Sequence, residues 1–331
     1  MSDDQQTLTQ PTDSTQRPTS INHFSFHGQG FDLAVLFLKN FFFLVITLGI
    51  YFPWARTNIR RFLWSNTQFN NDRFAYTGTG KELFLGWLKL SAILFAAVMM
   101  INLAQLILPS YFVVVTQILI FCAYMYLFAL ATYSGLRYRA LRTLWRQIQF
   151  NVDRDKDQTR QFLKLYIKGA LLSGLTLGLY LPFFTVNKTT FLVSKSNYGG
   201  KYFKFDGKGE DYFWICIKNF LLTVITFGIY TPWFIAKTLK YKVEHISIDQ
   251  AHFKFELSGK KLFIYSIVGY FGTLFTLGLA SPWIIVAFHK LFTESVTLVG
   301  NLDLSGAQNT TQNESAMGDD VAIIYDIDLG F

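Results

Sequence analysis

The sequence is poor in charge and cysteine, and it contains no recognisable catalytic motif. Only 16% of its 331 residues are charged, against about 25% in soluble domains. Its two cysteines, Cys122 and Cys216, both lie in apolar stretches and predict neither a disulfide framework nor a metal site. The five histidines form no metal-binding pair, and no nucleophile elbow occurs. We therefore expect no catalytic residue, no metal and no cofactor.

Apolar residues make up 51% of the chain and aromatic residues 18%. They gather in blocks that each reach the roughly 20 residues needed to cross a membrane as a helix. The first twenty residues are polar and lack the apolar core of a cleavable signal, so the first block is predicted to be a retained membrane segment. The blocks are 31–54, 83–108, 111–133, 162–186, 212–236 and 262–288.

Internal repetition is the strongest pattern. The stretch V-I-T-L-G-I-Y-F-P-W at 45–54 returns in similar form at 175–183, 224–233 and 274–283. An alternating strand closed by a glycine turn, at 21–30, also returns further along the chain. Together these features indicate a unit of about fifty residues. The predicted divisions are a disordered tail at 1–20, a repeat-built membrane domain at 21–299 with units near 24–70, 74–148, 150–200, 203–250 and 253–300, and an acidic polar tail at 300–331 with a candidate strand at 321–329.

The second unit is interrupted. Its opening aligns with the first unit at an offset of 50, whereas 142–151 aligns with 61–70 at an offset of 81. The extra residues between these matches are apolar, so they predict a helical hairpin with two full crossings.

The polar connectors read as short β-hairpins, which are marginally stable alone and should pair with one another. The sequence therefore predicts an α-helical integral membrane protein built from about five internal repeats, in which β-hairpin connectors form a small extramembrane sheet. Two topologies stay open. Loop charge favours six crossings, whereas the similarity of the connectors favours re-entrant units with all connectors on one side. In the second case Arg56, Arg60 and Arg61 need a wet cavity or an interface.

The net charge of +8 indicates a membrane surface with anionic lipids rather than nucleic acid. A polar stripe recurs in the first helix of the units, where acid and lysine lie two helical turns apart. An ionisable residue in an apolar segment is a functional hypothesis by default. This stripe predicts a polar cavity or a lipid-headgroup face; the plain alternative is that the lysines snorkel to the interface or pair with acids. Its members are Lys39, Lys89, Lys168, Lys218, Asp32, Glu82 and Asp211.

Aromatic residues flank the proline of each Thr-x-Gly element, where Trp and Tyr favour the headgroup level of a membrane. The predicted interfacial anchors are Trp54, Trp233, Trp283, Tyr51, Tyr180 and Tyr230.

The motifs I-T-L-G-I-Y-F-P-W-A-R (46–56) and F-K-F-D-G-K-G (203–209), with the closing Pro282-Trp283, resemble the YjgN-like family of uncharacterised bacterial inner-membrane proteins. The resemblance implies a multi-pass protein of the bacterial cytoplasmic membrane and brings no activity. From the residues we hypothesise a protein that binds or moves an anionic substrate or phospholipid. The alternative is a non-transporting scaffold whose β portion docks a partner, and a homo-oligomer also remains open.

Overall fold

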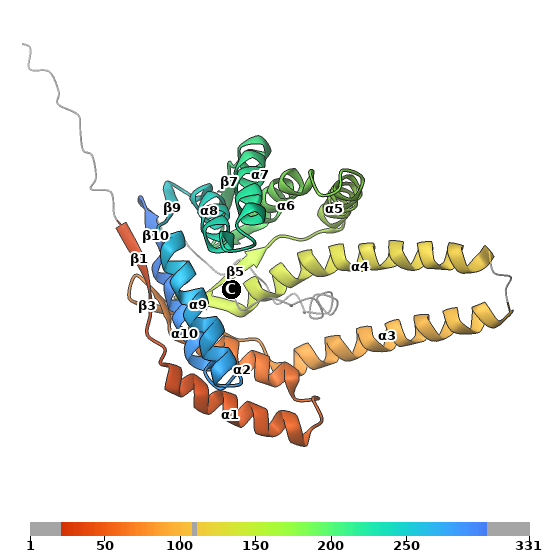
Figure 1. Ribbon diagram of the computed structural model, residues 1–331, viewed down its shortest axis with the longest axis horizontal. Coiled ribbons are helices and arrows are strands. Elements are labelled where there is room, and N and C mark those ends of the chain that lie inside the picture. Colours follow the sequence, from red (N-terminus) through yellow and green to blue (C-terminus); the bar gives the residue numbers. More distant parts are fainter. Residues whose placement is uncertain (1–20, 108–110, 303–331) are drawn as a thin grey trace, which may run out of the picture.

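The computed structural model describes residues 21–107 and 111–302, without the side chains of 89–90, 93–94 and 104–113. The predicted tails at 1–20 and 303–331 lie outside these residues, as does the candidate strand at 321–329. Within the described chain the order strand, helix, helix, strand occurs five times in succession (Figure 1). The elements are β1 (Ile21–Phe26), α1 (Gly30–Ile46), α2 (Phe52–Ser65), β2 (Thr67–Phe69), β3 (Asp72–Tyr76), α3 (Gly80–Ile107), α4 (Tyr111–Arg142), β4 (Thr143–Trp145), β5 (Ile148–Val152), α5 (Lys156–Leu175), α6 (Leu181–Lys195), β6 (Ser196–Tyr198), β7 (Lys201–Phe205), α7 (Gly209–Ile225), α8 (Thr231–Glu244), β8 (Ile246–Ile248), β9 (Ala251–Phe255), α9 (Gly259–Phe275), α10 (Ser281–Glu294) and β10 (Val296–Val299).

The strands form one closed antiparallel barrel in the order β1-β10-β9-β8-β7-β6-β5-β4-β3-β2. The first strand closes it, because β1 pairs through Ile21 with Val299 of β10 and through Phe24 with Phe69 of β2. Strands of three to six residues are marginal as isolated hairpins. Closure leaves no strand edge unpaired, which stabilises all of them together.

Side chains fill the barrel interior. Successive side chains of a strand point to opposite faces, so one residue near the middle of each long strand points inward. These residues are Phe24, Phe74, Phe150, Phe203 and Phe253, and they pack against the buried residues of the short strands. The buried residues are Phe69, Trp145, Tyr198, Ile248 and Leu298. The barrel therefore has a largely aromatic core.

The ten described helices form antiparallel pairs at one end of the barrel, and neighbouring pairs pack on each other. Helix α1 packs on α10, α2 on α3, α4 on α5, α6 on α7 and α8 on α9. Figure 1 shows α3 and α4 projecting far beyond the shorter hairpins. Proline occupies the first turn of α2, α6, α8 and α10, where its missing N–H costs no helical hydrogen bond.

The predicted fold class was wrong. The β connectors do not form a small sheet beside a multi-pass helical domain; they close into a ten-stranded barrel. Among the described residues one helical stretch, the 29 residues Val114–Arg142 in α4, is long and apolar enough to cross a membrane, and its most apolar window has a mean hydropathy of 2.1. Hairpin helices such as α1 and α2, with 17 and 14 residues, reach only about 25 and 21 Å at 1.5 Å per residue. The hydrocarbon of a bilayer is about 30 Å thick, which is more than either of these two helices spans.

Candidate functional site

A cavity of about 800 Å³ lies where the barrel meets the helices. Aromatic residues from three long strands line it, Phe24, Phe74 and Phe150. The rest of its lining comes from the second helices of three hairpins and from strand ends. Those residues are Trp64, Thr67, Leu136, Arg139, Ala140, Thr143, Asn151, Val152, Ser196, Asn197, His289, Phe292, Thr293 and Val296. The cavity thus combines an apolar floor with polar and cationic walls.

The histidine of this cavity is neutral at pH 7. Burial lowers the pKa of His289 from 6.5 to about 4, because a charged imidazolium loses solvation in an apolar site. Its Nε2 lies 3.1 Å from the Thr67 hydroxyl, and its ring stands edge-on to Phe26 with centroids 4.7 Å apart. The cationic character of the cavity therefore comes from arginine and not from His289.

The second helices of the hairpins are strongly basic. Burial lowers the pKa of Lys188 on α6. Burial, followed by the charge of Lys188, also lowers the pKa of Lys242 on α8, so these two lysines lie close enough to repel. Together the second helices carry two acids, Glu244 and Glu294, against twelve bases: Arg56, Arg60, Arg61, Arg137, Arg139, Arg142, Lys188, Lys195, Lys237, Lys240, Lys242 and Lys290.

The recurring threonine fixes the turn between the paired helices. The Thr176 hydroxyl donates to the Leu172 carbonyl (2.7 Å) and accepts from the Tyr180 N–H (3.0 Å). Thr47, Thr226 and Thr276 make the equivalent pairs. The following glycine closes a six-to-one hydrogen bond typical of a Schellman motif, as from Gly178 N–H to the Ser173 carbonyl (2.7 Å). This threonine therefore has a structural role in the turn.

Between that threonine and glycine stands a large apolar residue with positive φ. Its φ is 49° at Leu48, Leu177 and Phe227, and 52° at Leu277. Bulky side chains rarely adopt this region. These four side chains are also 93%, 95%, 97% and 93% exposed. Four strained, fully exposed apolar residues thus form the tips of the short hairpins.

The predicted lysine stripe lies on the exposed face of the first helices. Lys39, Lys168 and Lys218 are exposed, and none of them lines the cavity. The acids Asp32 and Asp211 are exposed as well. The side chain of Lys89 lies outside the described residues. A role at lipid headgroups stays a prediction.

An asparagine directly follows Lys39 and Lys218. Its side chain is buried and bonds to the second helix of the same hairpin. Asn40 donates to the Ala55 carbonyl (3.4 Å) and accepts from Asn58 (3.1 Å), which also donates to the Tyr51 hydroxyl (3.3 Å). In the fourth hairpin Lys237 replaces that partner and donates to Asn219 (3.1 Å) and to the Tyr230 hydroxyl (2.8 Å). The sequence patterns did not single out Asn58 or Lys237, although these two positions correspond at the repeat offset of 179.

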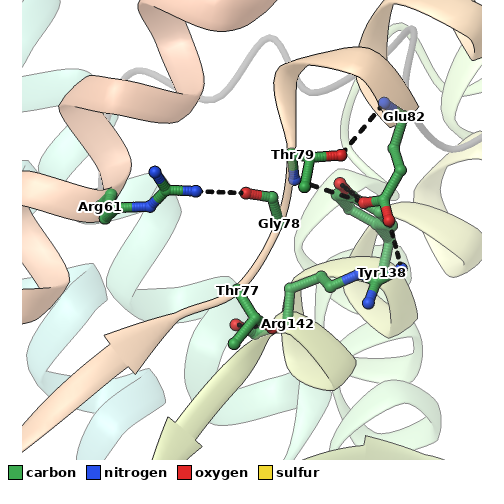
Figure 2. Close-up of polar contacts among 7 residues, drawn as sticks. All are labelled: Arg61, Thr77, Gly78, Thr79, Glu82, Tyr138 and Arg142. Carbon is green, nitrogen blue, oxygen red and sulfur yellow. Dashed lines mark hydrogen bonds and ion pairs between the residues drawn. The ribbon is translucent and has the colours of Figure 1, made fainter.

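Glu82 has a different environment from the rest of the predicted stripe (Figure 2). Its carboxylate accepts from the Thr79 N–H while the Thr79 hydroxyl accepts from the Glu82 N–H, a capping box at the start of α3. The same carboxylate accepts from the Tyr138 hydroxyl (2.9 Å) and forms an ion pair with Arg142 (2.7 Å). Glu82 therefore joins the bases of α3 and α4.

The three tryptophans among the predicted aromatic anchors pack against the next hairpin around the barrel. A Cβ on Gly80 would lie 2.5 Å from Trp54 Cδ1, and one on Gly259 would lie 2.3 Å from Trp233 Cδ1. Trp283 covers Gly30 in the same way. Tyr51 and Tyr230 stack on the tryptophan of their own hairpin, and Tyr180 stacks on Phe183. Close approach of an aromatic ring thus explains the glycine that begins these first helices.

Comparison with known proteins identifies relatives. A family model described as "Bacterial protein of unknown function (DUF898)" matches residues 22–206, 200–244 and 234–324. The protein named Inner membrane protein YjgN is 31% identical over 128 residues in Escherichia coli O157:H7 and 33% identical over 128 residues in strain K12, covering 39% of this chain and 30% of each relative. The Salmonella typhimurium protein of that name is 47% identical over 60 residues, 18% of this chain and 15% of the relative.

These alignments span about a third or less of the relatives' length. No solved structure matches. The relatives' names support an inner-membrane location and confirm the YjgN-like resemblance. Because the family model matches nearly all of residues 22–324, the chain belongs to the DUF898 family of bacterial proteins of unknown function.

Proposed function

We propose that this protein is a non-catalytic inner-membrane protein that binds anionic phospholipid. In this proposal the tips of the short hairpins enter one leaflet and do not cross the bilayer. The exposed lysines of the first helices then meet the headgroups of that leaflet, and the barrel stays in water.

The tip residues are the observation that carries the proposal. Placing a large side chain such as Leu177 or Phe227 in the left-handed region costs about 1–2 kcal/mol. With exposures of 95% and 97%, neither side chain recovers that cost by packing within the chain. Transfer into an apolar medium would return about 1.5–3 kcal/mol for each side chain. Lipid supplies such a medium, so the exposed tips favour insertion.

The spacing between lysine and tip fits the depth of one leaflet. Lys39, Lys168 and Lys218 each precede a tip residue by nine positions, which is about 13 Å along a helix. Half of the hydrocarbon thickness is about 15 Å. Lysines at the headgroup level would therefore place the tips near the bilayer centre, and each Lys near an anionic surface contributes about 1 kcal/mol.

The long hairpin supplies a deeper anchor. The apolar stretch Val114–Arg142 is only 11% buried over its most apolar window, so most of that surface is free to contact lipid. Glu82 fixes the base of this hairpin through Tyr138 and Arg142. One long hairpin surrounded by four shorter ones accounts for both the interrupted second unit and the length of the remaining helices.

The scaffold alternative has less support. Partners often dock on a β domain by adding a strand to a free edge, whereas every strand of this closed barrel already has two neighbours. Any partner would have to bind through side chains on the outer barrel face.

Lipid retention tests the proposal. In native mass spectrometry of the purified protein, replacing Lys39, Lys168 and Lys218 with Gln should lower the retained phosphatidylglycerol relative to phosphatidylethanolamine. A matched control replaces three exposed bases on the outer barrel face, Arg73, Lys204 and Lys254, and should retain lipid as the parent does. Equal retention by both triple variants would refute the headgroup role.

A further inference from the structure

We propose that the acidic segment 303–331 of this chain docks into the cavity at the barrel mouth, with its aspartates against the basic second helices. The cavity would then hold a built-in anionic peptide rather than a substrate. This inference goes beyond lipid binding and does not depend on it.

The cavity presents one lining cation above an apolar floor, and a second arginine lies close to it. Arg139 lines it directly, beside Trp64 and the Phe24–Phe74–Phe150 floor. Arg60 lies one helical turn from Trp64 on the same face of α2. Its guanidinium is buried, donates to the Tyr76 hydroxyl (3.3 Å) and lies 5.4 Å from that ring centroid. A partner for this site needs both carboxylates and apolar side chains.

Segment 303–331 has that composition. It contains six acids and no Lys, Arg or His, whereas the chain as a whole has a net charge of +8. Apolar residues lie between the acids in D-D-V-A-I-I-Y-D-I-D at 319–328. Carboxylates pair with arginine through short, charge-assisted hydrogen bonds, while the isoleucines and the tyrosine match the aromatic floor. The charges of cavity and segment are complementary.

The segment is also attached at a suitable place. It follows Leu302, which packs against the barrel core. Asp319 lies seventeen positions beyond Leu302, and Gly/Ser-type linkers of that length have a root-mean-square span of about 23 Å. The five-residue strand β9 covers only about 17 Å. Tethering therefore gives the segment a high effective concentration at the cavity. A free anion that binds with similar affinity would compete poorly with it.

Crosslinking of the full chain tests this docking. In a background with Cys122 and Cys216 changed to serine, one cysteine is placed in the segment by Ala322→Cys. The second is placed either on the cavity wall by Thr293→Cys or on the outer face of β9 by Lys254→Cys. A short bis-maleimide should link the cavity pair within one chain at least about tenfold faster than the outer pair, because docking raises the local concentration.

Charge provides the second arm of the test. Changing Asp319, Asp320, Asp326 and Asp328 to Asn should reduce the rate of the cavity crosslink to that of the outer pair, and high ionic strength should slow it in the parent. Correct folding is checked independently by the helical circular dichroism signal, which the Asn changes should leave intact.

Three results would overturn the proposal. The first is an equal crosslinking rate for the two pairs. The second is a cavity crosslink that forms only between two chains, which would assign the site to a second copy. The third is lipid or another anion retained in the cavity of the parent to the same extent as in the four-Asn variant, which would assign the site to that ligand.

Discussion

The depth of the hairpin tips is the sharpest prediction of the proposed arrangement. The perturbation is a single cysteine at a tip, Leu177→Cys or Phe227→Cys, in a chain whose Cys122 and Cys216 are serine. Each is labelled with a small fluorophore after reconstitution into vesicles. Both side chains are almost fully exposed, so labelling leaves the packing of the helix pairs intact.

The magnitude follows from helix geometry. Helix α7 runs from Gly209 to Ile225, 17 residues or about 25 Å, and its exposed Lys218 precedes the tip by nine residues. With Lys218 among the headgroups, the tip lies about 13 Å deeper, close to the centre of a hydrocarbon layer about 30 Å thick. Spin labels near the ends of the acyl chains should therefore quench these fluorophores more than spin labels near the headgroups.

Two controls bracket the measurement. Ile21→Cys, exposed on β1 at the barrel, should respond to aqueous iodide and not to either lipid-borne label. A tip fluorophore quenched by iodide, or most strongly by headgroup labels, would refute the half-inserted arrangement. It would indicate that the hairpins lie on the surface or traverse the bilayer.

Three further outcomes follow from the contacts. Thr176→Val removes both turn hydrogen bonds and should lower the free energy of unfolding by about 1–2 kcal/mol, measured by thermal unfolding in detergent; Thr190→Val, which removes one hydroxyl bond within α6, should cost less. Glu82→Gln keeps the shape but weakens the Arg142 pair and should cost about 1 kcal/mol, whereas Glu210→Gln, at an exposed position, should be neutral. Because the pKa of His289 is lowered to about 4 from 6.5, the unfolded chain binds more protons there, so stability should fall as pH drops from 6.5 towards 4. His289→Gln should flatten that part of the pH profile.

One apparent match between repeat units does not hold in the structure. The Leu-Trp of 144–145 was matched to that of 63–64, giving an offset of 81. In the structure Trp145 is a core residue of the barrel beside Phe69, whereas Trp64 lies on α2 and lines the cavity. The hairpin turns at Asn70-Asn71 and Arg146-Gln147 both have positive φ and correspond at an offset of 76. Trp64 and Trp145 thus share a Leu-Trp sequence, although they lie in different elements and only Trp145 is fully buried.

Residues that the sequence places in one polar stripe have different environments in the structure. Lys39, Asp32 and Glu82 belonged to a single predicted stripe because of their spacing. The first two are exposed, whereas Glu82 is held by Tyr138 and Arg142 of α4. Spacing along one helix cannot show which acids meet a base on another helix, since that base lies 60 residues away in the chain.

The sequence by itself determined the local elements: the alternating strands, the apolar helices, the Thr-x-Gly turns, and the family to which the chain belongs. These depend on periodicity and on backbone preferences within a few residues. Only the tertiary structure decided that the strands close into a barrel, that Trp54 covers Gly80, and that Arg139 faces a cavity while Lys39 faces outward. Those facts depend on pairing between distant segments, which is set by the total surface that closure buries and not by any single stretch.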